Sequence, residues 1–95
     1  MAFYNLGNIY LKAKVHKNAI ESYKTSARLN GRFAPTFYNL GIAYYETQDL
    51  NKALFNFQKA TRLDPTNKDY FYNTGVCLEA MGDKKSAAEY YRKAK

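Results

Sequence analysis

The sequence is poor in the residues on which most active sites depend. It has one histidine, one cysteine, two prolines and no tryptophan among 95 residues. His16 and Cys77 stand far apart, so neither a metal-ligand set nor a Cys–His nucleophile can be traced. We therefore predict no catalytic residue, no metal site and no cofactor, with Cys77 as a buried thiol and His16 as a solvated turn residue.

Long apolar segments and paired cysteines are absent too. No run approaches the ~18 consecutive apolar residues of a membrane-spanning helix, and no apolar leader opens the chain. We expect no membrane insertion. A lone cysteine excludes an internal disulfide and favours the cytoplasm or another reducing compartment, which is all that the sequence indicates about localisation.

Acidic residues are scarce as well. Eight Asp and Glu stand against fifteen Lys and Arg, and the net charge is +7. Residues 1–33 hold six of the cations and one of the acids, so most of the excess lies in the first third of the chain. A basic balance of this kind allows binding to nucleic acid or to an acidic surface.

What the chain has in abundance is repetition, with a period of 34 residues. The recurring positions are a phenylalanine, a glycine and an alanine: Phe3, Phe37 and Phe71; Gly7, Gly41 and Gly75; Ala19, Ala53 and Ala87. A fixed period over the whole chain indicates stacked copies of one supersecondary unit. It directs the search for function towards the surface that such a stack presents.

Each period contains two apolar stripes with helical spacing. They predict helices at about 2–13, 16–29, 35–47, 50–63, 68–81 and 84–95. We expect Asp49, Asn67 and Asp83 to cap helices, and Asn30-Gly31 to end one in a left-handed conformation. A glycine inside each first helix costs about 1 kcal/mol against alanine, so we expect it to allow close approach to the alanine of the second helix.

The strings FYNLGNIY, FYNLGIAYY and FYNTGVCLE, with the later alanines and the LDP at 63–65, resemble the tetratricopeptide repeat. The resemblance covers the whole chain and implies an all-α, right-handed superhelix of three antiparallel helix pairs, without a terminal capping helix. The units would be 1–33, 34–67 and a truncated 68–95 in a single domain. Met1 falls inside a unit, which suggests a piece of a longer protein.

The resemblance also implies that first helices line a concave groove and second helices form the convex back. The groove face would then carry tyrosine and asparagine in one register in all three units. We expect it to comprise Tyr4, Asn5, Asn8, Tyr38, Asn39, Ile42, Tyr45, Tyr72 and Asn73. Side-chain amides both donate and accept, so Asn5, Asn39 and Asn73 could hold the backbone of an extended peptide. They could equally bond to the adjacent helix and be structural.

Some three-repeat domains of this family clamp an acidic C-terminal carboxylate with lysines, asparagines and an arginine. The matching positions here are Tyr4, Asn8, Asn39, Asp69 and Asn73. Only two of these residues, both asparagines, match the residue type that the clamp has at that position. Asp69 would repel the carboxylate. The sequence therefore disfavours the binding of an acidic C-terminal segment.

Two alternatives remain beside the groove. A basic patch on the convex side could bind nucleic acid or an acidic surface, although solvated lysines explain the same pattern: Lys17, Lys24, Arg28, Lys52, Lys59 and Arg62. The uncapped last helix could leave Ala87, Tyr91 and Ala94 exposed for self-association. Our leading hypothesis is a non-catalytic scaffold or adaptor for protein interactions, whose groove binds a peptide segment of a partner.

Overall fold

The computed structural model describes residues 1–95 and contains six α-helices and no strand. The helices are α1 (Ala2–Lys12), α2 (His16–Leu29), α3 (Ala34–Glu46), α4 (Leu50–Leu63), α5 (Lys68–Ala80) and α6 (Lys84–Lys93). The bounds expected from the 34-residue period agree with these to within two residues at every end. Periodicity locates the helices well because each buries one apolar stripe against its neighbours.

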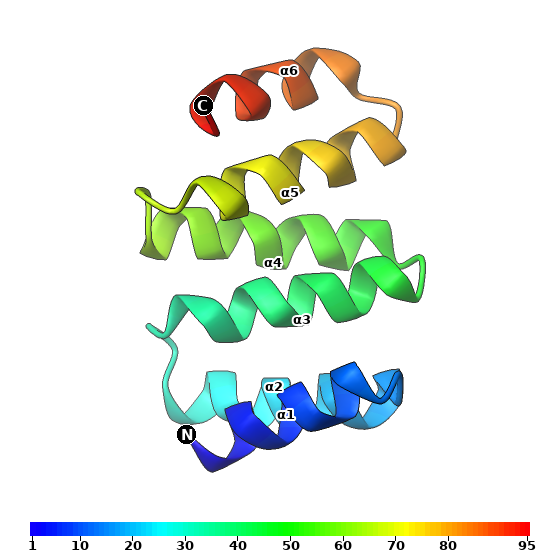
Figure 1. Ribbon diagram of the computed structural model, residues 1–95, viewed down its shortest axis with the longest axis vertical. Coiled ribbons are helices and arrows are strands. Elements are labelled where there is room, and N and C mark those ends of the chain that lie inside the picture. The colour runs from blue at the N-terminus through cyan, green and yellow to red at the C-terminus, as the bar shows by residue number, and fades with distance from the viewer.

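The helices stack in chain order, each antiparallel to the next, with the two termini at opposite ends of the stack (Figure 1). α1, α3 and α5 are the first helices of the three pairs, and α2, α4 and α6 are the second. First helices of adjacent pairs also touch, as α1 and α3 do. The molecule extends over 37 × 25 × 18 Å. The expected all-α superhelix of three helix pairs is confirmed.

The glycines inside the first helices leave room for an aromatic ring of the second helix to pack directly against the backbone. A Cβ atom on Gly41 would lie 2.6 Å from Cδ1 of Phe57, and the corresponding distances are 2.6 Å from Gly7 to Tyr23 and 2.7 Å from Gly75 to Tyr91. The steric role expected of these glycines is therefore present, but the partner is the aromatic ring and not the alanine. The alanines, such as Ala53, are fully buried elsewhere in the core.

Two of the three expected helix caps are present. The side chain of Asn67 accepts hydrogen bonds from the backbone N–H groups of Asp69 and Tyr70, and Asp83 accepts one from Ser86. Asp49 makes no cap hydrogen bond. Its carboxylate instead lies 3.8 Å from Lys52 Nζ, so the expected cap at this position is wrong.

Left-handed backbone occurs within the pairs and not between them. Lys14, Gln48 and Gly82 have φ values of 63°, 67° and 89°, and each lies in the turn between first and second helix. Asn30 is extended and Gly31 has no positive φ, so the expected left-handed terminator is wrong. The residue after each left-handed position donates to the carbonyl five residues back, as Asp49 N–H does to Tyr44 O at 2.9 Å, which closes a Schellman turn.

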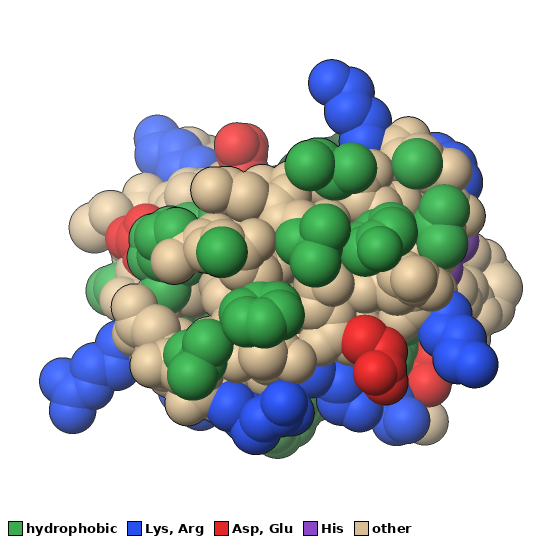
Figure 2. Space-filling model, turned by 90° about the horizontal axis from the view of Figure 1, so that it is seen from below, with side chains coloured by type: hydrophobic (Ala, Val, Ile, Leu, Met, Phe, Trp, Pro, Cys, Tyr) green, Lys and Arg blue, Asp and Glu red, His purple; other side chains and the backbone are tan.

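The exposed apolar end of the stack is α1, not α6. Leu6 and Ile9 are 38% and 65% exposed, whereas their counterparts on α3, Leu40 and Ala43, are 4% and 0% exposed. Viewed from this end, the molecule shows several apolar side chains on its surface (Figure 2). The second helix of the preceding pair covers the same register positions on α3 and α5, whereas the only second helix that packs on α1 is that of its own pair.

The expectation that Ala87 leaves apolar surface exposed on α6 is wrong, and Tyr91 and Ala94 are only partly exposed. Ala87 is 2% exposed, Ala94 is half-buried, and Tyr91 packs its ring on Gly75 within its own pair. The outer positions of this helix are polar or small instead, so α6 leaves little apolar surface open. They are Lys84, Lys85, Ala88, Glu89 and Arg92.

Candidate functional site

Tyrosine and asparagine side chains link each first helix to the preceding one in two separate hydrogen-bond clusters. Asn39 Nδ2 donates to the Tyr4 hydroxyl at 3.3 Å and to Asn8 Oδ1 at 2.9 Å. Asn73 Nδ2 donates to the Tyr38 hydroxyl at 2.6 Å. Each bond joins one first helix to the preceding one, so Asn39 and Asn73 have a structural role that sequence reasoning had left open. Asn5, on α1, is exposed and has no such partner.

The hydroxyls of Tyr23 and Tyr38 are neutral donors and acceptors at physiological pH. Burial raises the pKa of Tyr23 to about 12, although hydrogen bonding to asparagine lowers it in part. Burial and the nearby Asp69 carboxylate also raise the pKa of Tyr38. The Tyr23 hydroxyl donates to Asn8 Oδ1 at 2.6 Å and thereby fixes the orientation of that amide.

The carbonyl oxygen of Asn73 is open to a ligand. Both amide protons of Asn73 are used, one on Tyr38 and the other on the Asp69 backbone oxygen at 3.1 Å. No buried side-chain oxygen or nitrogen in the protein lacks a partner, so the Oδ1 atom, which accepts no hydrogen bond within the chain, is accessible. Asn73 can therefore accept a hydrogen bond from a ligand but has no amide proton left to donate.

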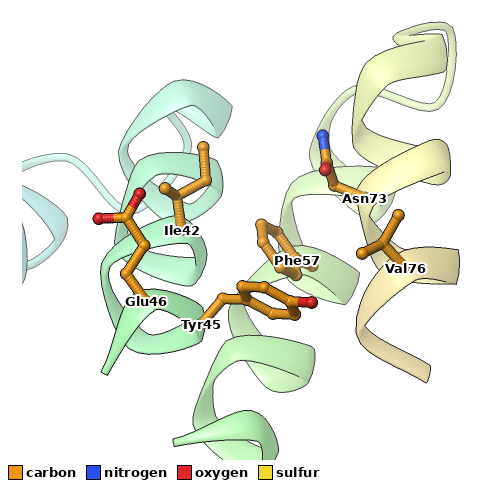
Figure 3. A pocket seen from close by; sticks show the side chains of 6 residues that line it. All are labelled: Ile42, Tyr45, Glu46, Phe57, Asn73 and Val76. Atoms are coloured by element: carbon orange, nitrogen blue, oxygen red, sulfur yellow. The ribbon is translucent and has the colours of Figure 1, made fainter. Parts of the chain in front are cut away.

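A pocket of about 230 Å³ opens beside this oxygen, between α3, α4 and α5 (Figure 3). Its wall is mostly apolar, and Glu46 points away from its centre (Figure 3). The lining residues are Ile42, Tyr45, Glu46, Phe57, Asn73 and Val76. The structure thus brings together Ile42, Tyr45 and Asn73 of the expected groove face.

Phe57 belongs to this site, although its place in the repeat predicts only a core role. Its counterparts in the other pairs are Tyr23 and Tyr91, so the second pair alone lacks the hydroxyl. In the first pair, that hydroxyl bonds to Asn8, the counterpart of Ile42. The paired change from Asn8 and Tyr23 to Ile42 and Phe57 is the sequence signal of an apolar pocket.

Glu46 is held away from the pocket by hydrogen bonds to Lys14 and His16. Its Oε1 atom lies 2.7 Å from His16 Nε2 and 3.2 Å from Lys14 Nζ. Hydrogen bonding to His16, then to Lys14, lowers the pKa of Glu46. This cluster joins the first pair to the second. His16 is a hydrogen-bond partner of Glu46 across the repeat boundary, and not only the solvated turn residue that its position predicts.

Several residues of the expected convex patch have structural partners. Lys59 Nζ lies 5.0 Å from the centre of the Phe37 ring, and Lys52 Nζ lies 5.6 Å from that of Tyr44. Contacts of this kind account for lysines at these positions without any ligand. The patch also includes four residues that are exposed on α2 and α4: Lys17, Lys24, Arg28 and Arg62.

The chemistry-bearing side chains do not cluster. Cys77 is fully buried and its thiol donates to the Leu50 carbonyl at 3.4 Å, with its pKa raised by burial. No three side chains among His, Cys, Asp and Glu come close enough together to hold a metal ion.

None of the six helices combines the length and apolar character that crossing a membrane requires.

Comparisons with known proteins agree with this architecture. Three family models, each described as a tetratricopeptide repeat, match residues 2–33, 34–67 and 56–89. No curated protein matches the chain by sequence. Among solved structures, one described as "MamA 41-end from Desulfovibrio magneticus RS-1" is 33% identical with a TM-score of 0.95, over 99% of this chain. Another, "Crystal structure of MamA", is 26% identical with a TM-score of 0.95, over 98% of it.

The chain spans about half the length of these solved structures, 53% and 54% respectively. The similarity therefore concerns three successive helix pairs and only part of each longer protein.

Proposed function

This chain belongs to the tetratricopeptide repeat family, whose members are scaffolds for protein interactions, and we propose that it binds an extended peptide segment of a partner protein along its groove face. We propose further that it does so without catalysis. The observation that carries this proposal is the apolar pocket beside the open Oδ1 of Asn73. Concave sites that combine an apolar wall with a few oriented polar groups are typical of ligand binding.

The asparagines offer a bound peptide fewer hydrogen bonds than a row of free side-chain amides would. The amide nitrogens of Asn39 and Asn73 are engaged with the preceding helix, so they align the first helices and present oxygen atoms. A peptide backbone supplies N–H donors at regular intervals, and those donors suit an accepting surface. Exposed Tyr72 and half-buried Tyr45 would add contact area with little loss of side-chain entropy.

A selection from a phage-displayed library of unstructured peptides tests this function. Selected peptides should bind the native chain, and amide chemical-shift changes in the ¹⁵N-labelled protein should fall on α1, α3 and α5. Ile42→Ala combined with Tyr45→Ala should weaken binding about tenfold or more, because each truncation removes buried apolar area. The matched control is Lys24→Ala with Arg28→Ala, on exposed positions of α2, and it should bind as the native chain does.

The reverse pattern would contradict groove binding. If the control pair loses the peptides and the groove pair keeps them, the basic side of the molecule is the working surface. Affinity should then also fall steeply with added salt, as phosphate or carboxylate contacts require.

A second candidate, self-association, is favoured by one observation, the exposed apolar side of α1. Leu6 and Ile9 occupy positions that a second helix covers on α3 and α5. We propose α1, and not α6, as the contact surface for any association between copies of this chain.

A further inference from the structure

We propose that the pocket beside Asn73 selects one aliphatic side chain of the bound segment, next to a lysine or arginine of that segment. This inference rests on the proposed function and specifies the chemistry of the partner. It would make the chain a reader of extended segments in which an aliphatic and a basic residue are adjacent.

The size of the pocket suits a single side chain. At about 230 Å³ it is smaller than the roughly 300–1,000 Å³ of pockets that hold whole drug-sized molecules. Ile42, Phe57 and Val76 present only carbon atoms, so a polar side chain packed against this wall would lose water without gaining a hydrogen bond from it. An aliphatic side chain has no hydrogen bonds to water to lose, and it buries its apolar surface.

Asn73 sets how the backbone of the segment lies at the pocket. Its free Oδ1 atom lies on the pocket side of the amide nitrogen (Figure 3). Because both amide protons are already donated within the chain, only a donor can pair with this side chain. The backbone N–H of the residue that fills the pocket, or of its neighbour, is the donor that an extended segment brings there.

The same pocket does not recur between the first two pairs. There Asn8 replaces Ile42, and its Oδ1 atom accepts both the Tyr23 hydroxyl and Asn39 Nδ2. These bonds fill the equivalent space with polar groups. The protein therefore offers one apolar pocket on this face, with a polar site one repeat away that serves as an internal control.

Charge is divided between the two sets of helices. The second helices carry ten Lys and Arg against two acids, a net +8, whereas the first helices carry two lysines against three acids, a net −1. A molecule of net charge +7 therefore presents a weakly acidic face where the pocket lies. This distribution disfavours an acidic segment and favours a basic one.

Glu79 is the carboxylate placed to meet that basic residue. It lies on α5 one helical turn beyond Val76, is exposed, and forms no ion pair within the chain. Its Oε1 atom accepts the Tyr91 hydroxyl at 2.8 Å, which holds the carboxylate in place and leaves Oε2 open. Glu46, on the other side of the pocket, is already paired with His16 and Lys14.

Three synthetic peptides test the proposal. Each is a nine-residue, acetylated and amidated Gly/Ser sequence with a different central pair: Leu-Lys, Leu-Glu or Ser-Lys. In 0.15 M NaCl, titration into the ¹⁵N-labelled chain should shift the amides of Ile42, Val76 and Asn73. The Leu-Lys peptide should bind about tenfold or more tightly than Ser-Lys, and about two- to fivefold more tightly than Leu-Glu.

Two variants separate the parts of the proposal. Ile42→Asn with Phe57→Tyr copies the Asn8–Tyr23 pair into the second repeat, an arrangement that this protein already folds with. It should abolish the preference for Leu over Ser. Glu79→Gln keeps an acceptor for Tyr91 and should abolish only the preference for Lys over Glu. Asn51→Ala, an exposed change on α4 outside the groove face, is the matched control and should alter neither preference.

The proposal is overturned if all three peptides bind equally, or if the Leu preference survives in the Ile42→Asn, Phe57→Tyr protein. Equal binding with shifts along α1, α3 and α5 would leave groove binding intact and remove the pocket's selectivity. If none of the three shifts any groove residue at millimolar concentration, the proposal fails; library peptides that still map to the groove would leave the proposed function standing.

Discussion

Single residues carry strain in the turns within the helix pairs. Gln48 is left-handed with φ 67°, and Gly82 holds the corresponding position in the third pair with φ 89°. An L-residue with a Cβ atom costs about 1–2 kcal/mol in this conformation. Glycine is free of that cost, so the first two turns are less favourable than the third.

Gln48→Gly should therefore stabilise the protein. We expect the free energy of unfolding to rise by about 0.5–1 kcal/mol, since the relief of strain exceeds the entropy that glycine adds to the unfolded chain. Urea denaturation followed by circular dichroism measures it. The neighbouring Thr47→Gly, where φ is −92°, should destabilise instead. Equal effects of both changes would show that Gln48 is unstrained.

The ion pairs of Glu46 make stability depend on pH. Hydrogen bonding to His16 and Lys14 lowers the pKa of Glu46 in the folded protein, so the stabilisation is complete above the ordinary carboxyl pKa. It is lost as pH falls from the ordinary carboxyl pKa through the lowered folded-state pKa. Glu46→Gln should flatten the fall of unfolding free energy over this interval.

The control for this measurement is Glu89→Gln, which removes an exposed carboxylate that forms no ion pair. It should leave the pH dependence close to that of the native chain. The same slope in the Glu46→Gln and native proteins would mean that the Glu46 pairs are too well solvated to matter.

At the scale of helices, contact between a glycine and an aromatic ring sets how closely each pair packs. The Phe57 ring is 2% exposed, whereas Tyr91 near the end of the stack is only half-buried and freer to shift. The same substitution should therefore have different consequences in different pairs.

Gly41→Ala should destabilise the protein by about 1–2 kcal/mol. Overpacking costs roughly 1–3 kcal/mol, and the gain in helix propensity of about 1 kcal/mol offsets part of it. Gly75→Ala, with the ring of Tyr91 freer to shift, should cost less. Thermal unfolding of the two variants decides this, and a larger loss for Gly75→Ala would contradict it.

Prediction from sequence worked well for helices and poorly for their ends. The period located all six helices because burial recurs at fixed positions. It did not reveal that Asp49 would pair with Lys52 and leave the helix uncapped, or that Asn30 would be extended. Each of these depends on a choice between competing local hydrogen bonds or ion pairs, whose energies differ by about 1 kcal/mol.

At the scale of the whole molecule, the two ends of the stack differ. The α1 end is apolar at Leu6 and Ile9, whereas the α6 end is mostly polar. Exposed apolar area drives association, and the basic side chains of α6 oppose it by mutual repulsion.

Ile9→Lys should therefore reduce self-association. Sedimentation equilibrium should show a lower weight-average mass at high protein concentration, because the variant places a charge in the centre of the apolar α1 surface. Ala88→Lys, at an exposed position of α6, should leave the mass unchanged. If only Ala88→Lys lowers the mass, the contact surface between copies lies on α6 and not on α1.

The sequence by itself determined the repeat, the family, the six helices and the helix faces on which tyrosine and asparagine recur. These follow from the 34-residue period and the spacing of residues within each helix, both of which can be seen in the sequence without knowing how the helices pack. Only the tertiary structure decided that the amide protons of Asn39 and Asn73 are already used, that Phe57 and Val76 complete a pocket, and that the apolar end is α1. Each of these depends on distances between side chains of different helices, which the spacing along one helix does not contain.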